Sequence, residues 1–453
     1  MSESLSGQEP EFAAFIALDW GDREHAWCMQ EAGSSRRERG TLEHRPEAIE
    51  AWAEQWGARF SGRPVAIAIE QARGAVIFAL AKYAHVVLYP IHPGTSHAYR
   101  QAIFPSGGKD DPKDADLLLD LLTGHRERLR ALEMDTEPTR LLQQLVEKRR
   151  QLVDLRTAHT NRITAMLKVY FPQVLDWFDD LGSALVGDFL DRWATLESVQ
   201  KERAEVLRAF FRQHHCRSEQ RIQQRLEQIL SARPLTEDAA VIQPAVLMVQ
   251  ALLAAVAALQ KGIAAVDREI EKAAAAHPDT FIFASFPAAG KAMCPRLVAA
   301  FGSRRERYSH AGQIQSFSGI APVISRSGSS HHWIHFRWAC PKFLRQTFHE
   351  YAAGTIARCA WARAFYQQQR ARGKSREAAI RSLAFKWIRI LFHCWQHRIC
   401  YDEAVLLRSR GAAPTAPAAE VSRPPIATAA AADAVEFEFK KVLGFVKFAA
   451  ANS

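Results

Sequence analysis

Closely spaced cysteine pairs are missing from this sequence. Its seven cysteines are scattered along 453 residues, and none belongs to a Cys-x-x-Cys motif. This arrangement argues against a disulfide-stapled secreted domain and against a common structural zinc site. We also find no signal peptide, no long uncharged apolar run and no internal repeat. We therefore expect a reducing, cytoplasmic setting and no membrane partner.

Acidic residues are too few to balance the basic ones. The chain has 59 Lys and Arg against 49 Asp and Glu, a net charge of +10 and a pI near 9.3. Such an excess favours a polyanionic partner, most often nucleic acid, although charge alone does not name it. The excess is concentrated in residues 281–410, which carry 21 basic and 5 acidic residues.

The first third of the chain has the pattern of an α/β domain. Short apolar runs at residues 13–21, 64–71 and 86–91 predict buried strands. Residues 24–31 and 36–43 predict two further strands that form an antiparallel meander with the first. Helical spacing of apolar residues predicts helices at 45–60 and 74–84. We expect a sheet with helices packed against it.

A helical region follows, from about residue 125 to 279. Apolar residues recur at helical intervals among charges, and residues 243–277 form a second long helical pattern. We expect two long helices packed antiparallel as a coiled-coil arm, with shorter helices between them at 173–240. Such an arm is suited to dimerisation.

Four segments follow from these patterns. We expect an α/β domain at 12–124, a helical coiled-coil and dimerisation region at 125–279, a mostly helical basic domain at 280–405, and an Ala/Pro linker and tail at 406–453.

Four carboxylates are predicted to meet in the α/β domain. Asp19 lies at the end of the first buried strand, and Glu70 has the equivalent place on the second. If these strands are parallel neighbours, as in a ribonuclease H-like sheet, the two side chains lie at one edge. Asp111 and Asp114 share one face at the start of a helix that can reach the same edge.

Clustered carboxylates repel one another unless a cation neutralises them. Their hard oxygen ligands select Mg²⁺ or Mn²⁺, and two such ions suit an in-line phosphoryl transfer. The alternative to metal binding is a local structural role. Asp110 or Asp111 can cap the helix, and Asp116 can simply be solvated.

The order of three motifs, FIALDWG, AIE and KDDPKDADLLL, resembles one family. It is similar to the DEDD, RuvC-like domain of the bacterial insertion-sequence transposases of the family numbered one hundred and ten. That family's third motif is Lys-x-Asp-x-x-Asp-Ala, which begins here at Lys109. The resemblance assigns its acids to Asp19, Glu70, Asp111 and Asp114, and it leaves Asp110 and Asp116 outside the site.

Residues 316–352 are similar to the C-terminal transposase domain of the same family, in which a serine attacks DNA and becomes linked to its phosphate. Ser327 matches the family's Ser-Gly position. Ser325, Ser329 and Ser330 are close alternatives, and Gly-Ser-rich sequence is often only a turn. Arg326 and Arg337 are candidates to neutralise the phosphate.

Further candidate nucleic-acid contacts lie in the basic domain. The alternating run 333–338 would place Trp333, His335 and Arg337 on one face of a strand, for packing or for base stacking. A basic stretch is a second candidate for phosphate binding, or else a solvated helix face; its residues are Arg370, Arg372, Lys374, Arg376 and Arg381.

Two smaller features have competing interpretations. Relatives in the family carry a Pro-Gly-x-Gly hairpin near residue 287, but here Ala288 replaces the first glycine, which disfavours a positive φ. A zinc site is suggested by four candidate ligands near the end of the basic domain, His393, Cys394, His397 and Cys400. Their spacing and apolar surroundings favour packing in a core or interface instead.

The resemblance implies a transposase or site-specific recombinase acting on double-stranded DNA at insertion-sequence ends. It also implies a serine–phosphate intermediate, a structured noncoding bridge RNA as guide, and a homodimer or homotetramer with composite active sites, located with the bacterial nucleoid. The alternative is a metal-dependent, RuvC-like nuclease that uses water as nucleophile. A third class is a nonenzymatic nucleic-acid-binding protein from a decayed element.

Overall fold

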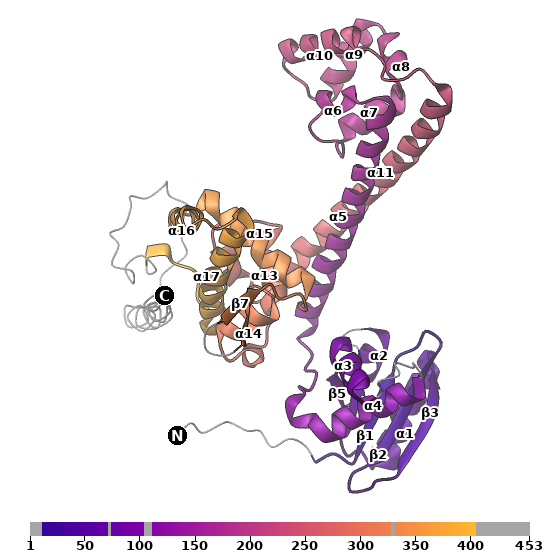
Figure 1. Ribbon diagram of the computed structural model, residues 1–453, viewed down its shortest axis with the longest axis vertical. Coiled ribbons are helices and arrows are strands. Elements are labelled where there is room, and N and C mark those ends of the chain that lie inside the picture. Colours follow the sequence, from indigo (N-terminus) through magenta and orange to yellow (C-terminus); the bar gives the residue numbers. More distant parts are fainter. Residues whose placement is uncertain (1–10, 71–73, 104–110, 328–330, 405–453) are drawn as a thin grey trace. The chain divides into compact units, whose positions relative to one another are not determined.

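The computed structural model describes residues 11–70, 74–103, 111–327 and 331–404. The chain divides into two compact units, with the boundary between Met134 and Asp135. Each unit is described by itself (Figure 1).

The first unit is built on a five-stranded mixed sheet. Its strand order is β3-β2-β1-β4-β5. Strands β1, β2 and β3 form an antiparallel meander, and β4 and β5 extend it in parallel with β1. The predicted sheet is therefore confirmed, and its order is consistent with a ribonuclease H-like domain. The strands are β1 (Ala14–Asp19), β2 (Glu24–Glu31), β3 (Arg37–Glu43), β4 (Val65–Ile69) and β5 (Val86–Pro90).

Two apolar cores cover the two faces of this sheet. Because side chains alternate along a strand, Ile16 and Leu18 lie on one face and Ala17 on the other. The first face packs against Trp52 and Trp56 of α1 and against α2. The second face packs against leucines of α4. The helices are α1 (Pro46–Arg59), α2 (Ala75–Leu80), α3 (Pro93–Ile103) and α4 (Asp111–His125), followed by η1 (Arg126–Arg128).

Small residues on the second face explain how closely α4 approaches the sheet. Ala17, Ala66 and Ala68 are fully buried there beneath Leu118 and Leu119 of α4. Their short side chains bring the helix backbone near the strands.

The second unit contains two long antiparallel helices, α5 (Glu137–Tyr170) and α11 (Ala239–Ala276). They lie side by side (Figure 1), and an ion pair joins Arg149 to Asp267. Two long helices were expected here; their description as a coiled coil stays a prediction.

One statement about the sequence was wrong. Residues 239–260 contain no charged residue, so a long uncharged apolar run is present after all. Helix α11 is long and apolar enough to cross a membrane by length and composition, and only 22% of its most apolar window is buried. The buried residues in its first half, among them Val249 and Val256, pack in the core of the adjoining small helices. Ile270 and Ala274 near its end pack in the core around α17 (Arg376–His397).

Five short helices connect the far ends of α5 and α11. Phe171, Phe189 and Phe211 are fully buried among them and form the centre of their own aromatic core. These helices are α6 (Gln173–Trp177), α7 (Ala184–Arg192), α8 (Leu196–Gln200), α9 (Ala204–Gln213) and α10 (Glu219–Ser231).

The remaining helices surround the near ends of α5 and α11. Helix α17 is their centre, and its Trp387, Cys394 and Trp395 are fully buried. Cys400 is exposed, so it does not share the surroundings of Cys394. The helical elements are α12 (Thr280–Ala284), α13 (Met293–Phe301), η2 (Arg305–Arg307), α14 (Ala311–Phe317), α15 (Lys342–Arg358), α16 (Ala360–Ala371) and α17 (Arg376–His397). The strands are β6 (Val323–Ser327) and β7 (His331–His335).

Ala288 adopts the conformation that its side chain disfavours. Its φ is +63°, although the absence of a glycine argued against a positive φ. The tight turn before α13 therefore forms with a Cβ atom in place.

Candidate functional site

Two acidic residues lie at the ends of adjoining parallel strands. Asp19 is the last residue of β1, and Glu70 directly follows β4. The register pairs Leu18 with Ile69, so Asp19 and Glu70 occupy the next position on each strand. Both are partly buried. The predicted juxtaposition of these two strand ends is confirmed.

Helix α3 contributes a direct contact to one of these acids. The hydroxyl of Ser96 donates a hydrogen bond to Glu70 Oε1, and Ser96 is itself buried. This bond restricts the rotation of the Glu70 side chain at the sheet edge.

A third acid, Asp114, lies in the first turn of α4. It is only 3% exposed, and its Oδ2 lies 2.6 Å from Nη2 of Arg100 on α3. A carboxylate this deeply buried requires such a countercharge. One helix, α3, therefore contacts both Glu70 and Asp114.

Asp111 is the first residue of α4, one turn before Asp114. Its side chain and all of Asp110 are outside the described part of the structure. Within that part, no group of three or more His, Cys, Asp or Glu side chains is close enough to hold a metal ion. The acids have the oxygen donors that Mg²⁺ or Mn²⁺ prefers, but Arg100 contacts Asp114 in this arrangement.

Asp116 faces a different part of the domain. It accepts hydrogen bonds from Cys28 Sγ at 3.0 Å and from Arg39 Nη2 at 3.0 Å, and it pairs with Arg37. Burial raises the pKa of the Cys28 thiol to about 12, and the Asp116 carboxylate adds to this. Asp116 therefore fastens α4 to β2 and β3, which explains why an acid outside the site is present here.

The predicted nucleophile lies at the end of a β-hairpin. Ser327 is the last residue of β6, opposite His331 on β7, and Ser325 lies opposite Trp333. Ser329 and Ser330 are outside the described residues, as are the side chains of Ser327 and Arg326. The strand β7 ends at His335, so the expected strand face extending to Arg337 was wrong.

Two family models match separate parts of the chain, and the first range includes the long helix α5. A model described as Transposase matches residues 16–172, and a model described as Transposase IS116/IS110/IS902 family matches residues 281–367. Together they cover more than half of the chain. The chain belongs to the IS110 family of transposases.

Two relatives match nearly the full length. A Streptomyces coelicolor protein named as a candidate mini-circle transposase for IS117 is 26% identical over 412 residues, with 87% of this chain and 97% of that protein covered. An uncharacterised 43.6 kDa protein of insertion element IS110, from the same organism, is 24% identical over 384 residues, with 83% and 93% covered.

The family matches contain most of the predicted site. The first range includes Asp19, Glu70, Asp111 and Asp114, and the second includes Ser327. The basic stretch lies outside both ranges. Membership in the IS110 family indicates an enzyme that processes DNA.

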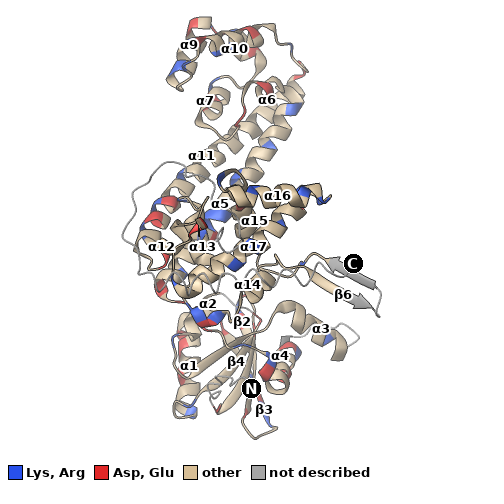
Figure 2. Cartoon of the chain, turned by 90° about the vertical axis from the view of Figure 1, so that its left-hand side faces the viewer, with Lys and Arg blue, Asp and Glu red and all other residues tan. Residues whose placement is uncertain are grey.

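Arg370, Arg372, Lys374 and Arg376 of the basic stretch are exposed, and Arg381 is partly buried. Figure 2 marks the basic residues of the chain in blue. Arg370 Nη1 donates to the Lys374 carbonyl at 2.7 Å, and Lys374 Nζ donates to Ser382. Arg376 pairs with Glu377 at 2.8 Å. Arg372 lies at the end of α16, within the turn that leads to α17.

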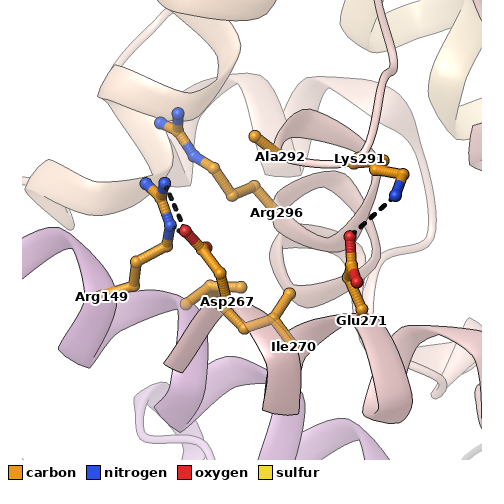
Figure 3. A pocket seen from close by; sticks show the side chains of 8 residues that line it. Arg149, Asp267, Ile270, Glu271, Lys291, Ala292 and Arg296 are labelled. Atoms are coloured by element: carbon orange, nitrogen blue, oxygen red, sulfur yellow. Dashed lines mark hydrogen bonds and ion pairs between the residues drawn. The ribbon is translucent and has the colours of Figure 1, made fainter. Parts of the chain in front are cut away.

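A small pocket of about 180 Å³ lies where α5, α11 and α13 meet (Figure 3). Its charges pair with one another, as in Arg149 with Asp267 and Lys291 with Glu271. Arg296 pairs with Glu350 of α15 at 2.5 Å. These pairs hold the surrounding helices together.

Ser96 and Arg100 were missed from the sequence. Both contact predicted site acids, yet neither belongs to an acidic motif, and α3 itself was not predicted. The only available signal was their four-residue spacing, which places two polar side chains on one helix face.

Proposed function

We propose that this IS110-family protein is a site-specific DNA recombinase that cleaves and rejoins insertion-sequence and target DNA. In this proposal Asp19, Glu70, Asp111 and Asp114 hold Mg²⁺ or Mn²⁺, and Ser327 is the nucleophile. The observation that supports it most is the alignment of Asp19 and Glu70 at adjoining parallel strand ends. Such an edge is the usual place for a ribonuclease H-like acidic site.

The bound ion would stabilise the charge that develops on the phosphoryl oxygens. The chain's own residues have separate tasks. Ser96 orients Glu70, and Arg100 neutralises Asp114 until the site is loaded. Ser327 Oγ forms a bond to phosphorus as the bond to a deoxyribose oxygen breaks, and the serine proton is lost to a nearby base.

The proposed partners follow from the family. They are double-stranded DNA and a structured noncoding guide RNA, bound in the cytoplasm with the nucleoid. The proposed assembly is a homodimer or homotetramer in which one protomer supplies the acids and its partner the serine. The exposed Leu247 and Met248 of α11 support association of copies, because exposed apolar side chains are typical of interfaces. The proposed domain bounds remain 12–124, 125–279 and 280–405, followed by the tail from 406 to 453.

The basic contacts belong to the same proposal. Arg326 and Arg337 would lie against the phosphate that Ser327 attacks. The exposed Arg370, Arg372, Lys374 and Arg376 would follow the DNA backbone further away, where basic residues outnumber acids.

A water-dependent nuclease is the second candidate, and one experiment separates the two. Asp19→Asn is expected to lower Mg²⁺-dependent cleavage of insertion-sequence ends by more than about 100-fold, since a ligand is lost. Ser327→Ala is expected to keep DNA binding and to remove the covalent protein–DNA adduct seen on denaturing gels.

Asp120→Asn is the matched control. Asp120 is also an acid of α4, but it pairs with Arg37 away from the site, so cleavage should persist. If Ser327→Ala still cleaves DNA and the parent protein forms no covalent adduct, the water-dependent nuclease is favoured. Full cleavage by Asp19→Asn would contradict both candidates.

A further inference from the structure

An unusually exposed aromatic side chain follows the serine-bearing hairpin. Trp338 is 82% exposed, more than any other large apolar side chain in the described part of the chain. It lies three residues after β7, the strand that pairs with the Ser327 strand. Such exposure is unfavourable in water, so a ring held there is suited to a partner.

The exposed Trp338 ring packs against a second aromatic ring. Trp338 meets Phe336 edge to face, with ring centroids 5.1 Å apart. Phe336 is itself contacted by two guanidinium groups, Arg345 of α15 and Arg381 of α17, each 4.6 Å from its ring centre. These contacts come from two helices of the bundle, so they hold the segment after the hairpin in place.

The surroundings of this ring pair are strongly positive. Burial lowers the pKa of Arg381, and the nearby Arg345 charge lowers it further. Arg345 Nη1 donates to the Arg337 carbonyl at 3.3 Å. The acid that faces Arg381 is Glu377, which already pairs with Arg376 and His349. Two cations this close together favour an anion between or beside them.

We propose that Trp338 stacks on an unpaired base while Arg345 and Arg381 bind the phosphate next to it. Base stacking on an aromatic ring beside a basic groove is the common chemistry of single-strand recognition. A closed duplex does not offer a free base face to Trp338. The inference rests on the proposed function and deepens it, because it adds a site for an unpaired nucleotide near the serine hairpin.

The test is equilibrium binding of the full chain, in EDTA, to short labelled oligonucleotides. Trp338→Ala is expected to weaken single-strand binding by roughly 10- to 100-fold, while Trp338→Phe loses much less. Duplex binding should change little. Arg381→Gln should reduce the slope of log affinity against log salt by about 0.7 for one lost phosphate contact.

Phe281→Ala is the matched control, because Phe281 is another exposed aromatic of the same unit. A homopyrimidine DNA strand and its RNA counterpart form separate arms, and the arm more sensitive to Trp338→Ala identifies the strand that supplies the base. EDTA removes the divalent ion that the proposed cleavage requires, so the binding result does not depend on the catalytic acids.

Three results would overturn the site. Single-strand binding unchanged in Trp338→Ala would show that the ring does not contact nucleic acid. Equal losses for duplex and single strand would show that no free base is read. A change in oligomeric mass with unchanged binding would assign Trp338 to a contact between protein copies.

Discussion

Arg100 is a cation at a place where a cation is expected to bind. Its Nη2 lies 2.6 Å from Asp114, a predicted metal ligand. Two positive charges cannot share one buried carboxylate without repulsion. In the proposed site Arg100 would therefore serve as a countercharge in the absence of metal and would compete with Mg²⁺ for Asp114.

Arg100→Ala should have two opposite effects. Without Mg²⁺ the protein should lose stability, by about 3–5 kcal/mol, because Asp114 stays buried without this partner. With Mg²⁺ or Mn²⁺ the rise in unfolding temperature should be larger than in the parent, since the ion binds more tightly. Thermal unfolding with and without each ion measures both effects.

Arg39→Ala is the control for this prediction. It also removes a partner from an acid of α4, Asp116, but away from the predicted metal ligands. An ion-induced shift in Arg100→Ala equal to that of the parent would contradict the competition.

At the residue scale, the sequence predicted where the acidic residues lie on the strands better than it predicted which side chains contact them. Asp19 and Glu70 could be found because each ends a buried apolar run, and strand ends meet at an edge. Ser96 and Arg100 could not be found in this way, because their contacts arise only when α3 packs near the end of β4 and against α4. Asp116 is the opposite case. Its acidic neighbours in the sequence suggested a place in the site, but its contacts with Cys28, Arg37 and Arg39 give it a role in holding α4 against the sheet.

Among the elements, the junction of α5 and α11 depends on a neutral histidine. His277 closes α11, with its Nε2 2.8 Å from Thr139 Oγ1 and its Nδ1 accepting from the Asp279 amide at 3.2 Å. Burial lowers the pKa of His277 below its ordinary value of 6.5. A protonated ring would lose the Nδ1 acceptor.

The stability of the second unit should therefore fall in mild acid. As the pH falls below 6.5, His277 becomes protonated in the unfolded chain but stays neutral in the folded protein, whose pKa for this group is lower. Acid therefore favours unfolding until the pH passes the folded pKa of His277. The contribution is fully present above pH 6.5. His277→Gln should flatten the fall in unfolding temperature between about pH 7.5 and pH 5.5.

Partly buried His349 also has a lowered pKa, so the parent profile alone does not identify the group. Comparison with His277→Gln isolates it. Parallel pH profiles for the two proteins would contradict a role of His277.

Elements with a clear period were the ones that could be predicted. The alternation and apolar runs of β1 to β5 specify a sheet, and the long spacing of apolar residues specifies α5 and α11. Helix α3 was missed because it contains few apolar residues, with Ser96 its buried member. The strand β7 was predicted too long because Phe336 continues the alternation, yet its ring packs against the guanidinium groups of Arg345 and Arg381 instead.

On the scale of the whole molecule, α11 leaves apolar side chains in water. Leu247 is 68% exposed and Met248 is 52% exposed, on neighbouring positions of one helix. In the proposed assembly these side chains pack against another copy of the chain. This surface was overlooked because residues 243–277 have the pattern of one helix that contains charges after residue 260. The uncharged run at residues 239–260 was therefore not recognised.

Leu247→Glu should shift the protein toward monomers. A charge in an apolar contact is costly, so the dissociation constant should rise by more than about 100-fold. Light scattering during size-exclusion chromatography gives the mass at a series of concentrations. Leu235→Glu, at an exposed leucine between α10 and α11, should leave the mass unchanged. A parent that is already monomeric, or a Leu247→Glu protein of the parent mass, would remove this surface from the assembly.

The seven thiols differ greatly in their access to reagents. Burial raises the pKa of Cys359 to about 12 and that of Cys294 to about 11, and Cys394 is fully enclosed. Cys400, by contrast, is exposed just after α17. A maleimide dye at neutral pH should therefore attach there first, which gives a natural labelling point for single-molecule fluorescence without removal of any native cysteine.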